Sequence, residues 1–213
     1  MDSNLKAVLL ALLAVVAGAG GFSDDFSGTV IDNDSWTVVS GDWIQNETLS
    51  SYWDLADACS IQGRIHLADS LQPTGDYSMS IDFYDAHGRF SVGFLDAQHA
   101  YNIVVDGSGP YRAMIERKNG SGCYVVLLEN HSVLMNGSGL NILTVNKTGV
   151  RYDVLVNGGH VLFHDDTAWN GTGKVGLNVY GPVEFDNFRL EATRSKNITL
   201  IEGWNLISVP IVI

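Results

Sequence analysis

Hydrophobic and polar residues alternate with a period of two along most of the chain after residue 21. The odd positions from Tyr77 to Phe83 are apolar, whereas the even positions from Ser78 to Asp82 are polar. Residues 90–94 and 101–105 repeat this pattern. Alternation of this kind is typical of β-strands that turn one face toward a core. Further strands are predicted at about 57–67, 111–117, 123–129, 140–146, 151–156, 160–164, 174–180 and 183–192.

Turn-forming residues separate these segments. Asn157-Gly158 lies between the apolar-polar runs 152–156 and 160–163, and this dipeptide is the strongest short hairpin signal in the chain. Gly-rich stretches at 106–110 and 171–173 mark other reversals. Many short strands at spacings of about 8–12 residues indicate an all-β fold, an antiparallel β-sandwich or barrel.

The first nineteen residues differ from this pattern. Lys6 precedes an unbroken apolar run from Ala7 to Val16, which leads into Ala17-Gly18-Ala19. This order predicts a secretory signal peptide over residues 1–19, with cleavage after Ala19, although a buried N-terminal helix is the alternative. The run is shorter than the about 20 residues that span a bilayer, so no membrane span is expected in the mature chain.

The composition narrows the range of partners. The 213 residues carry 12 Lys and Arg against 24 Asp and Glu, a net charge of −12. Such a chain is poorly suited to replace the counterions of a nucleic acid, so no nucleic-acid partner is expected. Hydrophobic residues make up 46% of the chain, enough for a sizeable core. The composition alone names no activity.

Sequons for N-glycosylation are unusually dense. Eight of the fifteen Asn residues stand in Asn-X-Ser/Thr, although Ser and Thr together number only 28. Some Asn-Gly-Ser/Thr sequons are also simple turns. The density nevertheless favours a glycosylated protein that is secreted or displayed at the cell surface. The predicted glycosylation sites are Asn33, Asn46, Asn119, Asn130, Asn136, Asn146, Asn170 and Asn197.

The two cysteines fit an exported protein. Cys59 and Cys123 are the only pair in the chain. Outside the reducing cytosol, such a pair is expected to form a disulfide rather than a metal or redox site, and two buried free thiols are the alternative.

Residues 140–190 resemble part of a known superfamily. The order of the runs 140–145, 149–158, 173–179 and 183–190 resembles the concanavalin A-like lectin/glucanase superfamily, especially its laminin-G-like and 3-keto-disaccharide-hydrolase-like jelly rolls. The opening 22–28, followed by Trp36 and Gly41-Asp42-Trp43, is similar to the first strands of such domains. The resemblance implies a jelly-roll β-sandwich over residues 20–193 but leaves the activity open.

The last twenty residues are set apart by a polar break at 191–196. Residues 194–213 are expected to form a linker and one or two strands. Glu202 to Ser208 resembles the start of modules common in archaeal surface proteins, which implies further domains in a longer chain.

Two chemical readings follow from the resemblance. Laminarinase-type relatives carry E-x-D-x-E on one strand, and the nearest match here, Glu184 to Phe188, replaces the third acid with Phe188. Related jelly rolls often hold a structural calcium near the first and last strands. The resemblance therefore implies a calcium site that uses Asp186 with Asp24 or Asp25, whereas Asp186 could instead only bond the adjoining turn.

Zinc is not expected. His160 and His164 are four residues apart, which would put them on one strand face at about 13 Å, too far for a single ion.

Ligand binding is the remaining possibility for the polar face of the central strands. If the sheet curves as in the superfamily, its polar positions line a concave side, where aromatic rings could stack on sugars. A solvated sheet face is the alternative. The predicted ligand-binding residues are Trp53, Asp82, Tyr84, Arg89, Asn102, Tyr111, Arg112 and Glu116.

Three functions stay open at this point. The first is an exported, non-catalytic module that binds a glycan or a cell-envelope component in carbohydrate binding or adhesion. The second is a glycoside hydrolase of the 3-keto-disaccharide-hydrolase type, for which no convergent catalytic cluster stands out. The third is a structural subunit of the cell envelope. Whether the chain is an enzyme is therefore uncertain, and the missing acid favours binding.

Overall fold

A computed structural model gives the fold. It describes residues 21–52, 63–84, 87–96, 98–106, 111–120, 123–137, 139–169, 173–179 and 183–193. The proposed signal peptide 1–19 and the tail 194–213 lie outside the described residues. Within the described part, no helix is long and apolar enough to cross a membrane.

Fifteen strands and one short 3₁₀ helix make up the described chain, which confirms the all-β prediction. The elements are β1 (Phe22–Asp24), β2 (Trp36–Ser40), β3 (Asp42–Gln45), β4 (Leu49–Tyr52), β5 (Gly63–Leu67), η1 (Asp69–Leu71), β6 (Asp76–Tyr84), β7 (His87–Asp96), β8 (His99–Asp106), β9 (Arg112–Asn119), β10 (Val125–Asn130), β11 (Asn141–Thr148), β12 (Arg151–Val156), β13 (Gly159–Asp165), β14 (Lys174–Val179) and β15 (Val183–Thr193).

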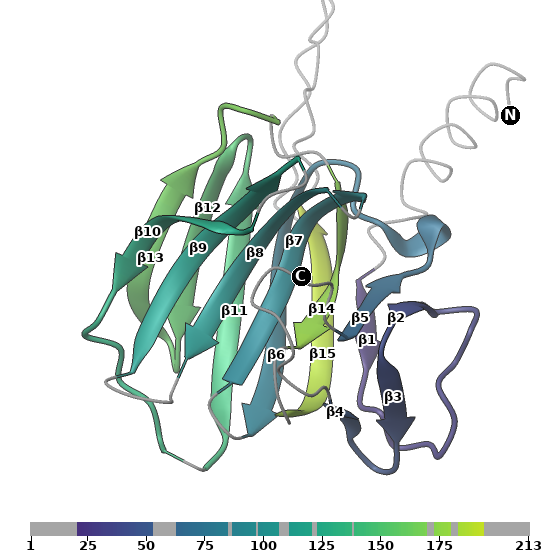
Figure 1. The fold of residues 1–213 in the computed structure, drawn as a ribbon. Coiled ribbons are helices and arrows are strands. Elements are labelled where there is room, and N and C mark those ends of the chain that lie inside the picture. The colour runs from purple at the N-terminus through teal and green to yellow at the C-terminus, as the bar shows by residue number, and fades with distance from the viewer. Residues whose placement is uncertain are drawn as a thin grey trace, which may run out of the picture.

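The strands form two antiparallel sheets that pack face to face (Figure 1). The seven-stranded sheet has the order β10-β9-β8-β7-β14-β5-β2 and stands in front in Figure 1. The eight-stranded sheet has the order β13-β12-β11-β6-β15-β4-β3, and β1 also pairs with β15. Strands that are distant in sequence are neighbours in both sheets, as in a jelly roll.

The core lies between the sheets, and the period of two explains its content. The odd residues of β6, from Tyr77 to Phe83, are buried as the sequence predicts. Phe185 and Leu177, on strands of opposite sheets, are also fully buried. Trp36 is buried against Phe188 with ring centroids 5.1 Å apart, so it belongs to the core as a first-strand residue of such domains should.

The hairpin between β12 and β13 turns at Asn157 and Gly158. Their φ values of 50° and 77° lie in the left-handed region that this type of turn requires. The Asn157 side chain accepts a hydrogen bond of 2.9 Å from the backbone N–H of Ile142, which ties the turn to β11. The hairpin prediction is therefore confirmed.

A bulge in β13 corrects one detail of the sequence reading. The register of β12 and β13 shifts between Val154 and Leu155. His160 therefore pairs with outward-facing Leu155, whereas His164 pairs with inward-facing Tyr152. The two histidines do not share a face, because the extra residue reverses the parity.

Candidate functional site

A row of polar side chains projects from the outer face of the seven-stranded sheet. In β5, Arg64 and His66 alternate with the core residues Ile65 and Leu67, so they point away from the core. The same alternation in β14, β8 and β9 places three more polar residues on this face. They are Asn178, Asn102 and Glu116.

These outer-face residues are buried although they point away from the core. Arg64 is 1% exposed, His66 2%, Asn102 0% and Asn178 1%. Polar side chains are rarely so deeply buried on a sheet face unless they are engaged with partners.

Aromatic rings flank the row. The half-buried ring of Phe94 lies 4.4 Å from the ring of His66 and 4.3 Å from the Arg64 guanidinium carbon. Arg64 Nη2 donates a hydrogen bond of 2.8 Å to the hydroxyl of Tyr124, just before β10. Asn178 Nδ2 donates a longer bond of 3.4 Å to Asn102 Oδ1. The row therefore combines planar donors and acceptors with two aromatic surfaces.

Several polar atoms of this row lack a hydrogen-bond partner in the structure. They are Arg64 Nε, His66 Nε2, Asn102 Nδ2 and Asn178 Oδ1, together with Oε2 of Glu116, a residue that has a further interaction. A buried donor or acceptor left without a partner costs about 1–3 kcal/mol. Such groups are rare in folded proteins and call for an explanation. Five such atoms on one face mark it as the candidate site.

The burial of His66 also sets its charge. Desolvation lowers the pKa of His66 to about 3, and the positive charges of Arg64 and Lys174 add to this effect. Asp69 acts in the opposite direction but more weakly. His66 is therefore neutral at neutral pH, so it can donate from one ring nitrogen and accept at the other.

The structure divides the predicted ligand-binding residues between two sheets. Asn102 and Glu116 lie opposite each other in the row on the seven-stranded sheet. Arg112 stands at the start of β9, where it bonds Asp106 at 2.9 and 2.7 Å, and Tyr111 precedes it. The backbone of Arg89 pairs with Asn178, while its side chain and all of Trp53 lie outside the described residues.

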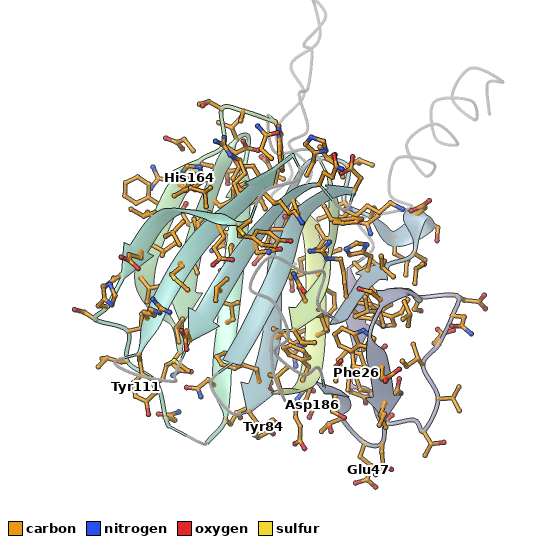
Figure 2. The ribbon with its side chains drawn as sticks, in the orientation of Figure 1. Phe26, Glu47, Tyr84, Tyr111, His164 and Asp186 are labelled. Carbon is orange, nitrogen blue, oxygen red and sulfur yellow. The ribbon has the colours of Figure 1, made fainter. Side chains whose placement is uncertain are left out.

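Asp82 and Tyr84 lie elsewhere, on the outward side of β6 in the eight-stranded sheet. The assumption of one shared concave side for all eight predicted residues is therefore wrong, because β6 and β7 belong to different sheets. Figure 2 shows Tyr84 and Tyr111 at the lower end of the sandwich.

Sequence reasoning missed Arg64, His66 and Asn178 in this row. Their signal was present, because each stands between apolar residues at alternating positions. What the sequence did not show is that β14 lies between β7 and β5 and pairs with both. That adjacency joins segments 63–67 and 174–179, which are more than 100 residues apart.

The proposed calcium residues have other partners in the structure. Asp24 Oδ1 accepts the Phe26 N–H at 2.8 Å, and its Oδ2 accepts the indole N–H of Trp36 at 2.7 Å. Asp25 is exposed, and hydrogen bonds from the Ser27 hydroxyl and backbone N–H lower its pKa.

The carboxylate of Asp186 faces a like charge across the strands. Asp186 lies directly opposite Asp82, and between them Asn187 donates to Asp82 Oδ2 at 3.0 Å and, through its backbone, to Asp186 Oδ1 at 2.7 Å. Among the residues described, no group of three or more His, Cys, Asp or Glu is placed to hold a metal ion. The oxygen-rich shell that calcium prefers is not assembled by these side chains, so calcium binding stays a prediction.

The sequons differ in their surroundings. Asn33, Asn46, Asn119 and Asn136 are exposed, whereas Asn130 and Asn146 are half-buried. Asn146 Oδ1 accepts a hydrogen bond of 2.7 Å from Ser78, and Asn130 Nδ2 donates to Val161 O at 2.6 Å. Asn170 and Asn197 lie outside the described residues. Glycosylation at all of these sites stays a prediction.

The described residues are compatible with the predicted disulfide between Cys59 and Cys123. No free thiol occurs among the described residues, which include Cys123. Cys59 falls in a segment that the structure does not describe, so the pairing stays a prediction.

Comparison with solved structures bears on the fold. The chain is similar to the carbohydrate-binding module CBM66 from Bacillus subtilis, with a TM-score of 0.60 and 19% identity over 76% of this chain and 99% of that one. It is similar to the Emp47p carbohydrate recognition domain, with a TM-score of 0.58 and 10% identity over 83% and 96% of the two chains.

A larger protein shares the fold in part. The GH43B protein of a Bacteroides ovatus xyloglucan PUL matches with a TM-score of 0.61 and 15% identity over 80% of this chain, which spans 39% of that protein's length. No protein family and no curated protein sequence matches the chain. The chain therefore has the concanavalin A-like jelly-roll fold that its sequence resembles.

Proposed function

We propose that the chain is an exported, non-catalytic carbohydrate-binding module of the cell surface, and that the outer face of the seven-stranded sheet binds the sugar. The observation that carries the proposal is the buried polar row of Arg64, His66, Asn102 and Asn178 with its partnerless atoms. Sugars present many hydroxyl donors and acceptors together with apolar ring faces. The amides suit the hydroxyls, and the rings beside the row suit the sugar faces.

Two kinds of support come from outside the row. The fold is shared with a carbohydrate-binding module and with a carbohydrate recognition domain. Export is supported by the signal-like residues 1–19 and by the sequons, four of which are exposed in the described part of the chain.

The number and positions of the acidic side chains on the outer face of the seven-stranded sheet favour carbohydrate binding over catalysis. A glycosidase usually needs two carboxylates across the scissile bond, about 5–9.5 Å apart. Among the described side chains in the middle of this face, Glu116 is the one acid. Asp106, at the far end of β8, is bonded to Arg112. A mass-spectrometric search for cleavage of oligosaccharides tests the hydrolase alternative.

The binding proposal is tested with the mature chain on a glycan array, followed by calorimetry on the best glycan. Asn102→Ala should weaken binding at least tenfold, because it removes a buried amide from the row. Asn33→Ala, an exposed amide on a remote loop, is the matched control and should leave the affinity unchanged. Retained affinity in a folded Asn102→Ala variant, or no glycan bound at all, would overturn the proposal.

A structural envelope subunit is the second candidate, favoured by the edge strand β10. There Val125 is 60% exposed, Val126 45% and Leu128 39%. An exposed apolar edge strand is a template for pairing with another chain. Light scattering should then show self-association that Val126→Lys abolishes, and a monomer at high concentration would exclude this role.

A further inference from the structure

Arg64 is a buried cation whose hydrogen bond and ring contact are with neutral groups. Its guanidinium contacts the ring of Phe94 and the hydroxyl of Tyr124, while Nε has no acceptor. None of the ion pairs found among the described residues includes Arg64. Burying a charge without an opposite charge is costly, so this arrangement calls for an anion.

The other charges on this part of the face include both signs. Lys118 lies on the same face, with Nζ 5.7 Å from the centroid of the Tyr124 ring. Lys174 acts on His66 together with Arg64, but its Nζ is paired with Asp69 Oδ1 at 2.6 Å. Glu116 lies on β9, as Lys118 does, and β8, β7 and β14 separate that strand from β5 and Arg64. Arg64 therefore stands out as a buried cation outside the ion pairs of the described residues, in a chain of net charge −12.

We propose that the Arg64 end of this face binds an anionic group of the glycan, a carboxylate or a sulfate carried by the sugar. This inference rests on the proposed carbohydrate-binding function and names the class of sugar. A guanidinium offers parallel N–H donors that match the two oxygens of a carboxylate or sulfate. The anion would accept from Nε, which has no partner, and from Nη2 in place of the neutral Tyr124 hydroxyl. Asn102 and Asn178 are then left for the hydroxyls of the same sugar.

The test compares glycans of equal length in calorimetry with the mature chain. Polygalacturonate oligosaccharides carry carboxylates, dextran sulfate oligosaccharides carry sulfates, and laminarin oligosaccharides are neutral. We expect one anionic class to bind at least tenfold more tightly than the neutral one, with an affinity that falls as salt is raised. The comparison of polygalacturonate with dextran sulfate shows whether the site binds a carboxylate or a sulfate.

The variants assign this preference to Arg64. Arg64→Gln should reduce anionic binding to the neutral level, and Arg64→Lys, which keeps the charge but not the fork, should lose most of it. Arg151→Gln is the matched control, because Arg151 lies 4.2 Å from the ring of Phe163 on the other sheet. It should bind like the unaltered chain.

Each outcome decides between the two proposals. Neutral glycans bound as tightly as anionic ones, with binding lost in Asn102→Ala, would overturn the anionic preference and leave the carbohydrate-binding function standing. Anionic binding that survives in a folded Arg64→Lys variant at full strength would also overturn it. No binding of any glycan would overturn both.

Discussion

The guanidinium of Arg64 donates a hydrogen bond of 2.8 Å to the hydroxyl of Tyr124, although β9, β8, β7 and β14 lie between their strands in the sheet. In a flat sheet, five strand spacings would keep the two backbones about 24 Å apart. Tyr124, which precedes β10, therefore reaches across the outer face to Arg64. Tyr124 thus closes one side of the polar row.

Loss of this contact should be measurable in stability. Tyr124→Phe removes the acceptor of a buried guanidinium, so we expect the free energy of unfolding to fall by about 1–2 kcal/mol in urea denaturation. Tyr84→Phe, on the outward side of the other sheet, should change it by less than about 0.5 kcal/mol. Equal effects of the two substitutions would mean that the Arg64 contact contributes nothing.

The low pKa of His66 makes stability depend on pH. The folded pKa is about 3 and the ordinary value is 6.5, so the unfolded chain binds a proton first as the pH falls. Stability should therefore drop between pH 6.5 and pH 3, by about 2 kcal/mol at pH 5 relative to pH 8 from this group.

Denaturation at both pH values checks this dependence. His66→Gln should reduce the difference between pH 8 and pH 5 by about that amount, because the titrating group is gone. An unchanged pH dependence in His66→Gln would show that His66 is not held neutral by burial.

Substituting Asp24 and Asp25 one at a time should distinguish a structural role of these aspartates from a calcium-binding role. Asp24→Ala removes the acceptor of both the Phe26 N–H and the Trp36 indole, and Phe26 holds a strained φ of 48°. We expect it to cost about 1–3 kcal/mol. Asp25→Ala, which is exposed, should cost less than about 0.5 kcal/mol in the presence of EDTA.

Calcium itself is tested by melting curves with EDTA and with calcium added back. If Asp25 and Asp186 hold the ion, calcium should raise the melting temperature, and Asp25→Ala should abolish the rise. A melting temperature that is the same with EDTA and with millimolar calcium would exclude the site.

The predicted disulfide has a large expected effect. Closing the loop between Cys59 and Cys123 should stabilise the fold by about 4 kcal/mol on the chain-entropy model. Thiol titration of the denatured, unreduced chain provides the check, and two free thiols would contradict the pairing.

The sequence determined the fold class and most of the strands. Alternation such as that from Tyr77 to Phe83 is a local property, because successive side chains of a strand point to opposite faces whatever their neighbours are. The Asn157-Gly158 turn is equally local, since its left-handed φ values depend on residue type. The superfamily resemblance then supplied the jelly-roll arrangement.

Only the tertiary structure decided which polar residues meet. Asp82 and Arg89 are seven residues apart, yet they belong to different sheets, whereas Arg64 and Asn178 are joined by the pairing of β5 with β14. Parity along a strand tells which residues share a face, but strand order is set by long-range packing of the two sheets. That order assembles the proposed binding face and places the buried charge of Arg64 at one end of it.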